Sequence, residues 1–167
     1  MSQSRRVWRP AYVGLGSNLE NPARQIEAAF ELLRGIPETR LIACSPLYNT
    51  SPFGVVEQPD FVNAAAALLT RLGPLDLLAK FQEIERNQGR EQGGERWGPR
   101  ILDLDLLVYS DRVIDEPTLK VPHPGIAERN FVLLPLRDLA PELVVPGLGR
   151  VIKIPVNAQE PRITRIV

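Results

Sequence analysis

Two aspartates, Asp103 and Asp105, are the residues whose type and spacing most clearly permit chemistry in this chain. They lie in a segment that alternates polar and apolar residues, and strand residues separated by one lie on the same side, roughly 6 to 7 Å apart. Carboxylate oxygens at that spacing can hold one divalent ion or two. A solvated strand face is the plainer alternative. However, aspartate is unfavourable in strands, and both aspartates stand inside the strongest strand pattern of the chain.

A glycine-rich segment that carries arginines precedes the two aspartates. Residues 86 to 100 contain four arginines, two glutamates and four glycines, which predicts a loop with a local charge of 4 − 2 = +2. Its Arg90, Arg96 and Arg100 offer planar forks that match phosphate oxygens, as Mg²⁺-nucleotide chemistry requires. The alternative is a solubilising surface, because the chain has 17 arginines and only three lysines. The glycines favour a lid that closes over a ligand.

His123 is the one histidine of the chain, and Cys44 is its one cysteine. A lone histidine is more often structural than catalytic, and without a second imidazole a typical zinc cluster is not expected. Cys44 lies within an apolar strand pattern, which predicts a small core residue. Phe61, Trp97 and Phe131 could stack on a planar heterocycle, although aromatic side chains are core material by default.

The hydrophobic patterns predict a split βαβ order of elements that positions these residues. The predicted elements are a strand over 7–15 running into a turn at 14–18, a helix from Pro22 to a stop at Gly35 with Asn21 as its N-cap, strands over 41–48 and 61–70, a helix opened by Gly73 and Pro74, and a strand over 101–109. A hairpin connection at 110–112 to a short strand at 113–114, a short helix from Pro135 to Leu139, and irregular structure from Pro146 complete the prediction.

This order predicts an α+β fold with a mainly antiparallel sheet. Right-handed crossovers place the two long helices on one face and leave the other face to loops and ligand. In the strand 101–109, Leu102, Leu104, Leu106 and Val108 are predicted on the face opposite to the aspartates.

The composition limits the possible partners. The chain has 167 residues, so one domain is expected, and 20 Lys and Arg against 20 Asp and Glu give a net charge of zero. This balance argues against broad binding of nucleic acid or of an anionic membrane. The longest apolar run, six residues, is far short of the roughly 20 that span a bilayer. No P-loop motif occurs. One cysteine leaves no internal disulfide, so a reducing cytoplasm is the predicted location.

Four sequence segments occur in an order that is specific for one enzyme family. They are Ala11-Tyr-Val-Gly-Leu-Gly-Ser-Asn-Leu19, Gln58-Pro-Asp-Phe-Val-Asn-Ala64, Arg96-Trp-Gly-Pro-Arg-Ile-Leu-Asp-Leu-Asp105 and Val121-Pro-His-Pro124. Together they resemble the 6-hydroxymethyl-7,8-dihydropterin pyrophosphokinase family (HPPK) of folate biosynthesis. The resemblance covers about residues 11–146 of a single domain over 1–167, and leaves 147–167 as a tail. It implies a ferredoxin-like βαββαβ fold with a small C-terminal addition. It also implies an ATP-dependent transfer of pyrophosphate to the pterin hydroxymethyl group, which releases AMP.

The resemblance further implies roles for individual residues. Asp103 and Asp105 would ligate two Mg²⁺ ions, and Arg90 and Arg100 would act with them in catalysis. The implied ATP contacts are Gln82, Glu85, Arg90, Arg96, Arg100 and His123. The implied pterin contacts are Thr50, Pro52, Phe53, Phe61, Asn63, Trp97 and Phe131. Two of these, Phe61 and Phe131, would stack on the two faces of the ring. Gln92 departs from those family members that carry an arginine at its position.

Two other function classes fit the predicted topology. A single-stranded RNA-binding module has the same βαββαβ order, but it needs exposed aromatic residues and a basic face, whereas the strongest strand here carries two aspartates. A regulatory domain that binds a small ligand without chemistry is the second alternative. The expected partners are ATP and the hydroxymethyl-dihydropterin, with no nucleic acid and no membrane, and a monomer is expected.

Overall fold

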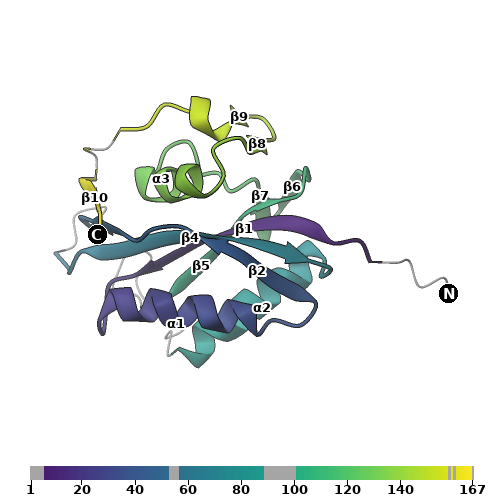
Figure 1. Ribbon diagram of the computed structural model, residues 1–167, viewed down its shortest axis with the longest axis horizontal. Helices are drawn as coiled ribbons and strands as arrows, with labels where there is room; N and C mark the ends of the chain where they lie inside the picture. Colours follow the sequence, from purple (N-terminus) through teal and green to yellow (C-terminus); the bar gives the residue numbers. More distant parts are fainter. Residues whose placement is uncertain (1–5, 53–56, 89–100, 158, 160, 167) are drawn as a thin grey trace.

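A six-stranded antiparallel sheet forms the centre of the molecule. The computed structural model describes residues 6–52, 57–88, 101–157, 159 and 161–166. The sheet has the strand order β10-β3-β4-β1-β5, with β2 also paired to β4, and all these pairs are antiparallel. Helices α1 and α2 lie on one face of the sheet and α3 lies over the other (Figure 1). Within the described residues, no helix has the length and apolar character that crossing a membrane requires.

The elements have the following bounds. The strands of the main sheet are β1 (Arg9–Ser17), β2 (Thr39–Cys44), β3 (Tyr48–Thr50), β4 (Phe61–Thr70), β5 (Asp103–Tyr109) and β10 (Ile163–Arg165). The helices are α1 (Pro22–Arg34), α2 (Pro74–Asn87) and α3 (Asn130–Leu139), with a short 3-10 turn η1 (Val151–Lys153). Two small hairpins pair β6 (Ile114–Glu116) with β7 (Leu119–Val121), and β8 (Val144–Val145) with β9 (Gly149–Arg150).

The two long helices begin where the sequence predicts. Pro22 and Pro74 occupy the first position of α1 and α2, because proline has the φ angle of a helix and its missing N–H has no helical partner at that position. Asn21 is the N-cap residue of α1, but its backbone is left-handed and its side chain makes no capping hydrogen bond. Gly35 ends α1 as predicted.

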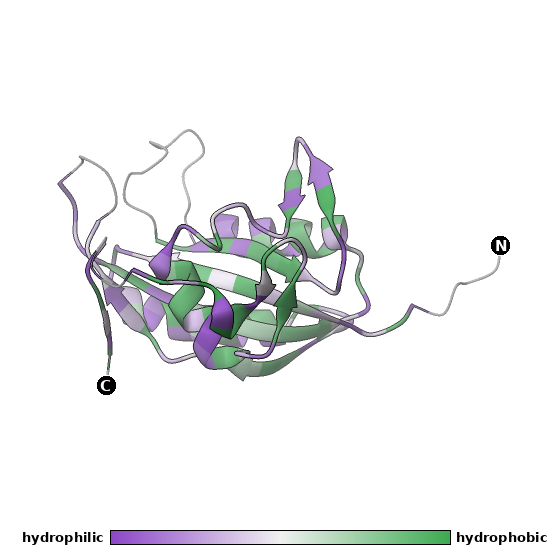
Figure 2. Ribbon diagram, turned by 90° about the horizontal axis from the view of Figure 1, so that it is seen from above, coloured by the Kyte–Doolittle hydropathy of each residue, from purple (hydrophilic) through white to green (hydrophobic). Residues whose placement is uncertain are grey.

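The larger hydrophobic core lies between the sheet and the two long helices. Alternate residues of the central strands point into it, and Ile26 of α1 and Phe81 of α2 meet them there, both fully buried. Such burial removes large apolar side chains from water and is the main favourable term in folding. Figure 2 shows this hydrophobic character along the strands, with the β6–β7 hairpin standing away from the sheet.

A second core lies between the sheet and α3, so the prediction of a face left wholly to loops and ligand is wrong in part. Leu133 and Leu136 of α3 pack there with Val145 and Val151 of the C-terminal segment. Helix α3 begins at Asn130, and Pro135, the predicted start, lies inside it. The burial of its neighbours in the helix offsets the loss of the backbone hydrogen bond that Pro135 cannot donate.

Strand β5 changes its alternation part-way along its length. Val13 of β1 lies opposite Leu106, whereas Tyr12 lies opposite Val108, so Leu107 is an extra residue in β5. A bulge of this kind turns the following residues to the other face. Leu107 and Val108 therefore join the core beneath α3, and the prediction that Val108 shares a face with Leu106 is wrong.

Three strand predictions are corrected by the sheet pairing. The predicted strand 41–48 is divided at Ser45 and Pro46 into β2 and β3. The strand predicted at 113–114 pairs as β6 with β7 and not with β5. Strand β1 continues to Ser17, so the chain turns only from Asn18.

Two predictions about buried and irregular segments are also wrong. Cys44 is exposed and not a core residue, because β2 pairs only with β4 and most of its side chains face solvent. The segment after Pro146 is not irregular throughout, because it contains β9, η1 and β10, and β10 extends the main sheet by one strand.

The bulge brings the Leu107 side chain close to the bare position at Gly14. An ideal Cβ at Gly14 lies 3.3 Å from the Leu107 Cδ2 atom, and Leu107 is fully buried. We expect Gly14→Ala to lower the free energy of unfolding by about 1–3 kcal/mol, because the packed leucine must shift. Urea unfolding followed by circular dichroism measures this change.

Gly35→Ala is the matched control. Its Cβ meets only the Leu32 carbonyl oxygen at 3.5 Å, and its φ of −84° suits any residue. We expect this variant to be unchanged or more stable by about 0.4–1 kcal/mol. Equal unfolding midpoints for the two variants would contradict the packing argument.

Candidate active site

Asn63 and the two aspartates project from the face of the sheet that α3 partly covers. In the strand register, Gly16 of β1 lies between Asn63 of β4 and Asp103 of β5. Residues directly opposite one another on neighbouring strands share a face. Asn63 and Asp103 therefore project from the same face, separated by two strand spacings, or roughly 9 to 10 Å. Glycine has no side chain, so nothing from β1 fills the space between them.

A second glycine repeats this arrangement one step along β1. Gly14 lies between Ala65 of β4 and Asp105 of β5, so a second row carries a carboxylate beside a bare position. An ideal Cβ at Gly16 would lie only 2.9 Å from the Asn63 Oδ1 atom. The position of the Asn63 side chain thus depends on β1 having no side chain at Gly16.

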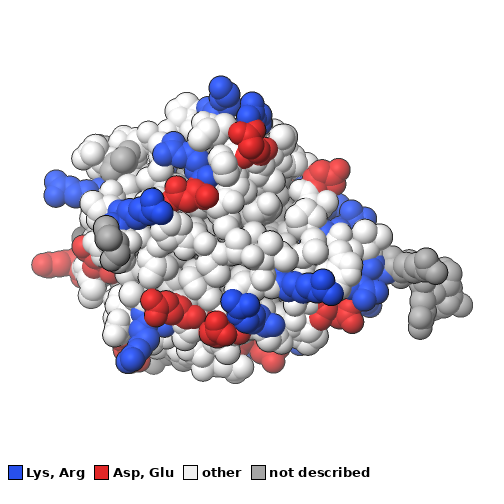
Figure 3. Space-filling view, viewed as in Figure 1, with Lys and Arg blue, Asp and Glu red and all other residues white. Residues whose placement is uncertain are grey.

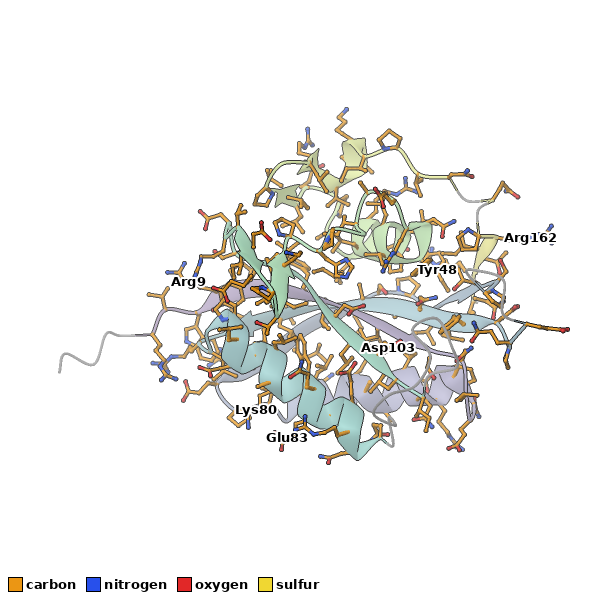
Figure 4. All side chains as sticks on the ribbon, turned by 180° about the vertical axis from the view of Figure 1, so that it is seen from behind. Arg9, Tyr48, Lys80, Glu83, Asp103 and Arg162 are labelled. Atoms are coloured by element: carbon orange, nitrogen blue, oxygen red, sulfur yellow. The ribbon has the colours of Figure 1, made fainter. Side chains whose placement is uncertain are left out.

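The two aspartates are held by a hydrogen bond to the backbone between them. Asp103 is half-buried and Asp105 is exposed. The N–H of Leu104 donates to the Glu85 Oε2 atom at 2.9 Å, and Glu85 is only 6% exposed. Glu85, predicted as an ATP contact, is therefore a buried carboxylate that joins α2 to β5. Gln82, one turn earlier on α2, is exposed. In Figure 4, the labelled Asp103 lies at the end of β5.

The imidazole of His123 has a defined tautomer. The Gly125 N–H donates to His123 Nδ1 at 2.9 Å, so the proton of the neutral ring is on Nε2. The backbone N–H of His123 donates to the Leu107 carbonyl at 2.8 Å, which joins this loop to β5. Burial lowers the pKa of His123, Asp105 opposes this effect and Arg129 adds to it. The ring is therefore neutral at pH 7, next to one carboxylate and one guanidinium.

The predicted pterin contacts come mainly from β3 and β4. Asn63 Nδ2 donates to Thr50 Oγ1, and both residues are buried. Phe61, directly opposite Thr50, is half-buried, as are Pro52 and the more distant Phe131 at the second position of α3. Helix α3 packs against β4, so the sheet and the helix supply two sides of this region.

Several predicted site residues lie outside the described residues. These are Phe53, Arg90, Gln92, Arg96, Trp97 and Arg100. Of the predicted loop and lid at 86–100, residues 86 and 87 belong to α2 and are not a loop, and residues 89–100 lie outside the described residues.

Three residues of the site had no role in the sequence analysis. Asn18, almost fully buried, donates through Nδ2 to Gln58 Oε1 at 2.8 Å and to the Pro59 carbonyl at 3.2 Å. It joins the end of β1 to the loop before β4. Asn18 and Gln58 belong to the four family motifs, and this was the signal in the sequence that could have indicated them as site residues. Arg129 is the third, and only the fold brings it beside His123.

The described residues that suit a metal ion are few. Among them, no group of three or more His, Cys, Asp and Glu is arranged to hold a metal. Asp103 and Asp105 remain as a pair of hard oxygen donors on one face, which fits Mg²⁺, an ion that is usually bound through one or two carboxylates and substrate phosphates.

Comparison with known proteins decides the family. A sequence profile described as 7,8-dihydro-6-hydroxymethylpterin-pyrophosphokinase (HPPK) matches residues 12–141. The chain belongs to this family. The resemblance seen in the four motifs is thereby confirmed.

Relatives in the HPPK family cover most of the chain. A protein of Pseudomonas aeruginosa named 2-amino-4-hydroxy-6-hydroxymethyldihydropteridine pyrophosphokinase is 55% identical over 81% of this chain and 83% of its own length. A protein of the same name from Haemophilus influenzae is 43% identical over 82% of this chain and 85% of its own length. The folic acid synthesis protein fol1 of Schizosaccharomyces pombe is 41% identical over 81% of this chain but only 18% of its own length.

Solved structures share the fold. Wild-type HPPK-DHPS of Plasmodium falciparum superposes with a TM-score of 0.69 at 17% identity, over 88% of this chain and 44% of that longer chain. The same protein with STZ-DHP gives a TM-score of 0.72 at 16% identity, over 90% of this chain and 43% of that longer chain. At this identity the likeness concerns the fold alone, and it confirms a mixed α/β structure like that of HPPK proteins.

The buried imidazole predicts a pH dependence of stability. Because the pKa of His123 is lowered in the folded chain, the unfolded chain takes up the proton first as the pH falls below 6.5. The stabilising contribution is complete above pH 6.5 and is lost as the pH falls through the folded pKa. Urea unfolding above and below pH 6.5 tests this, with His123→Gln expected to lose this part of the pH dependence.

The single histidine makes the titration direct. NMR of the one imidazole should give a midpoint below 6.5 for the folded chain. A midpoint above 6.5 would show that Asp105 outweighs burial and would contradict the prediction.

Proposed function

We propose that the protein transfers the terminal pyrophosphate of ATP to the hydroxymethyl oxygen of 6-hydroxymethyl-7,8-dihydropterin, giving AMP and the pterin diphosphate. The chain is an enzyme of the HPPK family, whose relatives carry the pyrophosphokinase name at 55% and 43% identity, and the reaction is a step of folate biosynthesis. The observation that carries the proposal is the row Asn63–Gly16–Asp103, since it puts a polar edge partner and a carboxylate on one face with no side chain of β1 between them.

The pterin binds on the β3–β4 side of this row. A fused polar ring needs stacking faces and hydrogen-bonding partners for its edge. Asn63 supplies the edge partner, held in place by the hydrogen bond that its Nδ2 donates to Thr50 Oγ1, and the backbone around Thr50 completes the pocket. Phe61 and Phe131 stack on the ring, with Pro52 adjoining it. Phe53 and Trp97 complete the predicted contacts.

The triphosphate binds on the β5 side. Arg90, Arg96 and Arg100 neutralise its charge and orient it through planar forks. His123 donates a hydrogen bond from Nε2 to a phosphate oxygen, which the acceptor role of its Nδ1 supports. Arg129 adds a cation beside His123. The remaining predicted ATP contacts are Gln82 and Glu85.

The reaction is an in-line displacement at the β-phosphorus. The pterin hydroxymethyl oxygen gives up its proton to solvent and forms a bond to this phosphorus, while the bond from the β-phosphorus to the α–β bridging oxygen breaks and AMP leaves with that oxygen. Asp103 and Asp105 hold two Mg²⁺ ions, which when bound supply positive charge to the phosphate oxygens. The arginines stabilise charge that develops on the transferring group, while the strand keeps the two carboxylates in place.

The antiparallel order β3-β4-β1-β5 with α1 and α2 on one face supports a ferredoxin-like βαββαβ fold. We further propose a single domain over residues 1–167, a monomer, and a cytoplasmic location, the last supported by the single cysteine.

An RNA-binding role has less support. On the face shown in Figure 3, Lys and Arg alternate with Asp and Glu around a central band without charged residues, and neither sign dominates. Nucleic-acid binding through phosphates needs a clustered basic surface. Incubation with ATP, Mg²⁺ and the hydroxymethyl-dihydropterin, followed by detection of AMP, separates the enzyme from both alternatives.

The two aspartates provide the sharpest variant. We expect Asp103→Asn with Asp105→Asn to lower turnover at least about 100-fold, because a phosphoryl-transfer site that loses its metal ligands loses several kcal/mol of charge stabilisation. AMP release at saturating ATP and pterin is the measurement. The fold should persist, since the Leu104 N–H and Glu85 remain.

Asp111→Asn is the matched control for this variant. Asp111 is an exposed aspartate outside the site, in the turn that follows β5. Its turnover should equal that of the natural chain. Retained Mg²⁺-dependent turnover in the double variant would refute the metal assignment.

A further inference from the structure

The C-terminal residues 161–166, here called the C-terminal strap, form the outer edge of the main sheet. Within the strap, β10 pairs antiparallel with β3, and Ile163 lies directly opposite Thr50. Backbone bonds flank this pair, from the Ser51 N–H to the Arg162 carbonyl at 3.0 Å and from the Ile166 N–H to the Leu47 carbonyl at 2.8 Å. Figure 1 shows β10 at the edge of the sheet, beyond the end of α3.

A second link joins the start of the strap to α3. Asn130, the first residue of α3, is 4% exposed, and its Nδ2 donates to the Pro161 carbonyl at 2.7 Å and to the Asn157 carbonyl at 2.6 Å. Its Oδ1 has no hydrogen-bond partner among the described residues. The amide therefore acts here as a donor, and the next residue in the helix is Phe131.

The strap thus connects two groups of predicted pterin contacts that come from different layers of the fold. Thr50 and Asn63 belong to the sheet and are joined by the hydrogen bond from the Asn63 amide to the Thr50 hydroxyl. Phe131 belongs to α3. Tyr48 of β3 adds a direct link between the layers, because its hydroxyl donates to Asp138 of α3. Figure 4 shows the labelled Tyr48 toward α3 and Arg162 at the edge of the molecule.

We infer that the C-terminal strap and Asn130 position the pterin pocket by fixing the sheet-borne contacts relative to Phe131. The inference rests on the proposed function, since it takes Thr50, Asn63 and Phe131 as pterin contacts. Asn130 is a positioning residue and touches no substrate in this scheme. The strap consequently affects pterin binding and leaves ATP binding alone, because Asp103, Asp105 and His123 lie on β5 and the loop after β7.

The register supplies a matched pair of variants. In an antiparallel ladder, hydrogen-bonded and non-bonded pairs alternate. Arg162 and Ile166 bond to β3, so Thr164 between them occupies a bonded position opposite Asn49. Arg165 occupies a non-bonded position, with its N–H turned away from β3. Both side chains are exposed, so proline at the two positions differs chiefly in the ladder bond that it removes.

The experiment measures substrate constants for three variants. Thr164→Pro removes the ladder bond, Arg165→Pro is its control, and Asn130→Asp places an acceptor against two carbonyl oxygens without changing side-chain size. We expect the pterin Kd and KM of Thr164→Pro and Asn130→Asp to rise about tenfold, the effect of losing roughly one hydrogen bond, with the KM for ATP within about twofold. Calorimetry with the hydroxymethyl-dihydropterin, with and without a non-hydrolysable ATP analogue and Mg²⁺, gives Kd. The AMP assay gives KM and kcat.

The outcomes separate this inference from the proposed function. Equal pterin constants in Thr164→Pro and Arg165→Pro, with Asn130→Asp also unchanged, overturn the inference while the activity stands. Parallel increases in both substrate constants overturn it too, because a merely structural role predicts them. If the natural chain neither binds the pterin nor releases AMP, the proposed function fails and takes this inference with it.

Discussion

The bare surface of β1 is the constraint on which the site depends. Gly14 and Gly16 lie in the row between β4 and β5, and both point to the face beneath α3. A methyl group at Gly16 would lie 2.9 Å from the Asn63 amide oxygen, and one at Gly14 would press on buried Leu107. At Gly16 the central strand therefore carries no side chain where both its neighbours, Asn63 and Asp103, carry polar ones. The Asn63 amide and the Leu107 side chain lie over the two glycines, so the bare positions determine where these side chains pack.

Contacts from outside the sheet hold the polar rows in place. Glu85 accepts the N–H of the peptide between the two aspartates, which joins α2 to β5 through a buried carboxylate. His123 is fixed through both its backbone and its ring. At the other end, burial and the hydrogen bond to Asp138 raise the pKa of Tyr48 to about 12, so its phenol remains a donor to α3.

The fold could be predicted from the sequence wherever a local pattern alone decides where a strand or helix lies. The bounds of β4 and the proline starts of α1 and α2 agree with the sequence, because alternation and the first-turn preference of proline are local properties. Prediction failed where pairing partners decide. Cys44 is exposed because β2 pairs only with β4, and β10 forms because β3 offers it an edge. The helix around Pro135 forms because α3 buries Leu133 and Leu136 against the sheet.

By itself, the sequence determined the family and the residue types of the chemistry. The Asp-Leu-Asp spacing puts two carboxylates on one side of any strand, and the four motifs identify the HPPK family in one linear order. Only the tertiary structure decided which distant residues adjoin. The register puts Asn63 and Asp103 in one row, the loop after β7 brings Arg129 beside His123, and the tail lies against Thr50. These pairings depend on strand order and burial, which are properties of the whole chain.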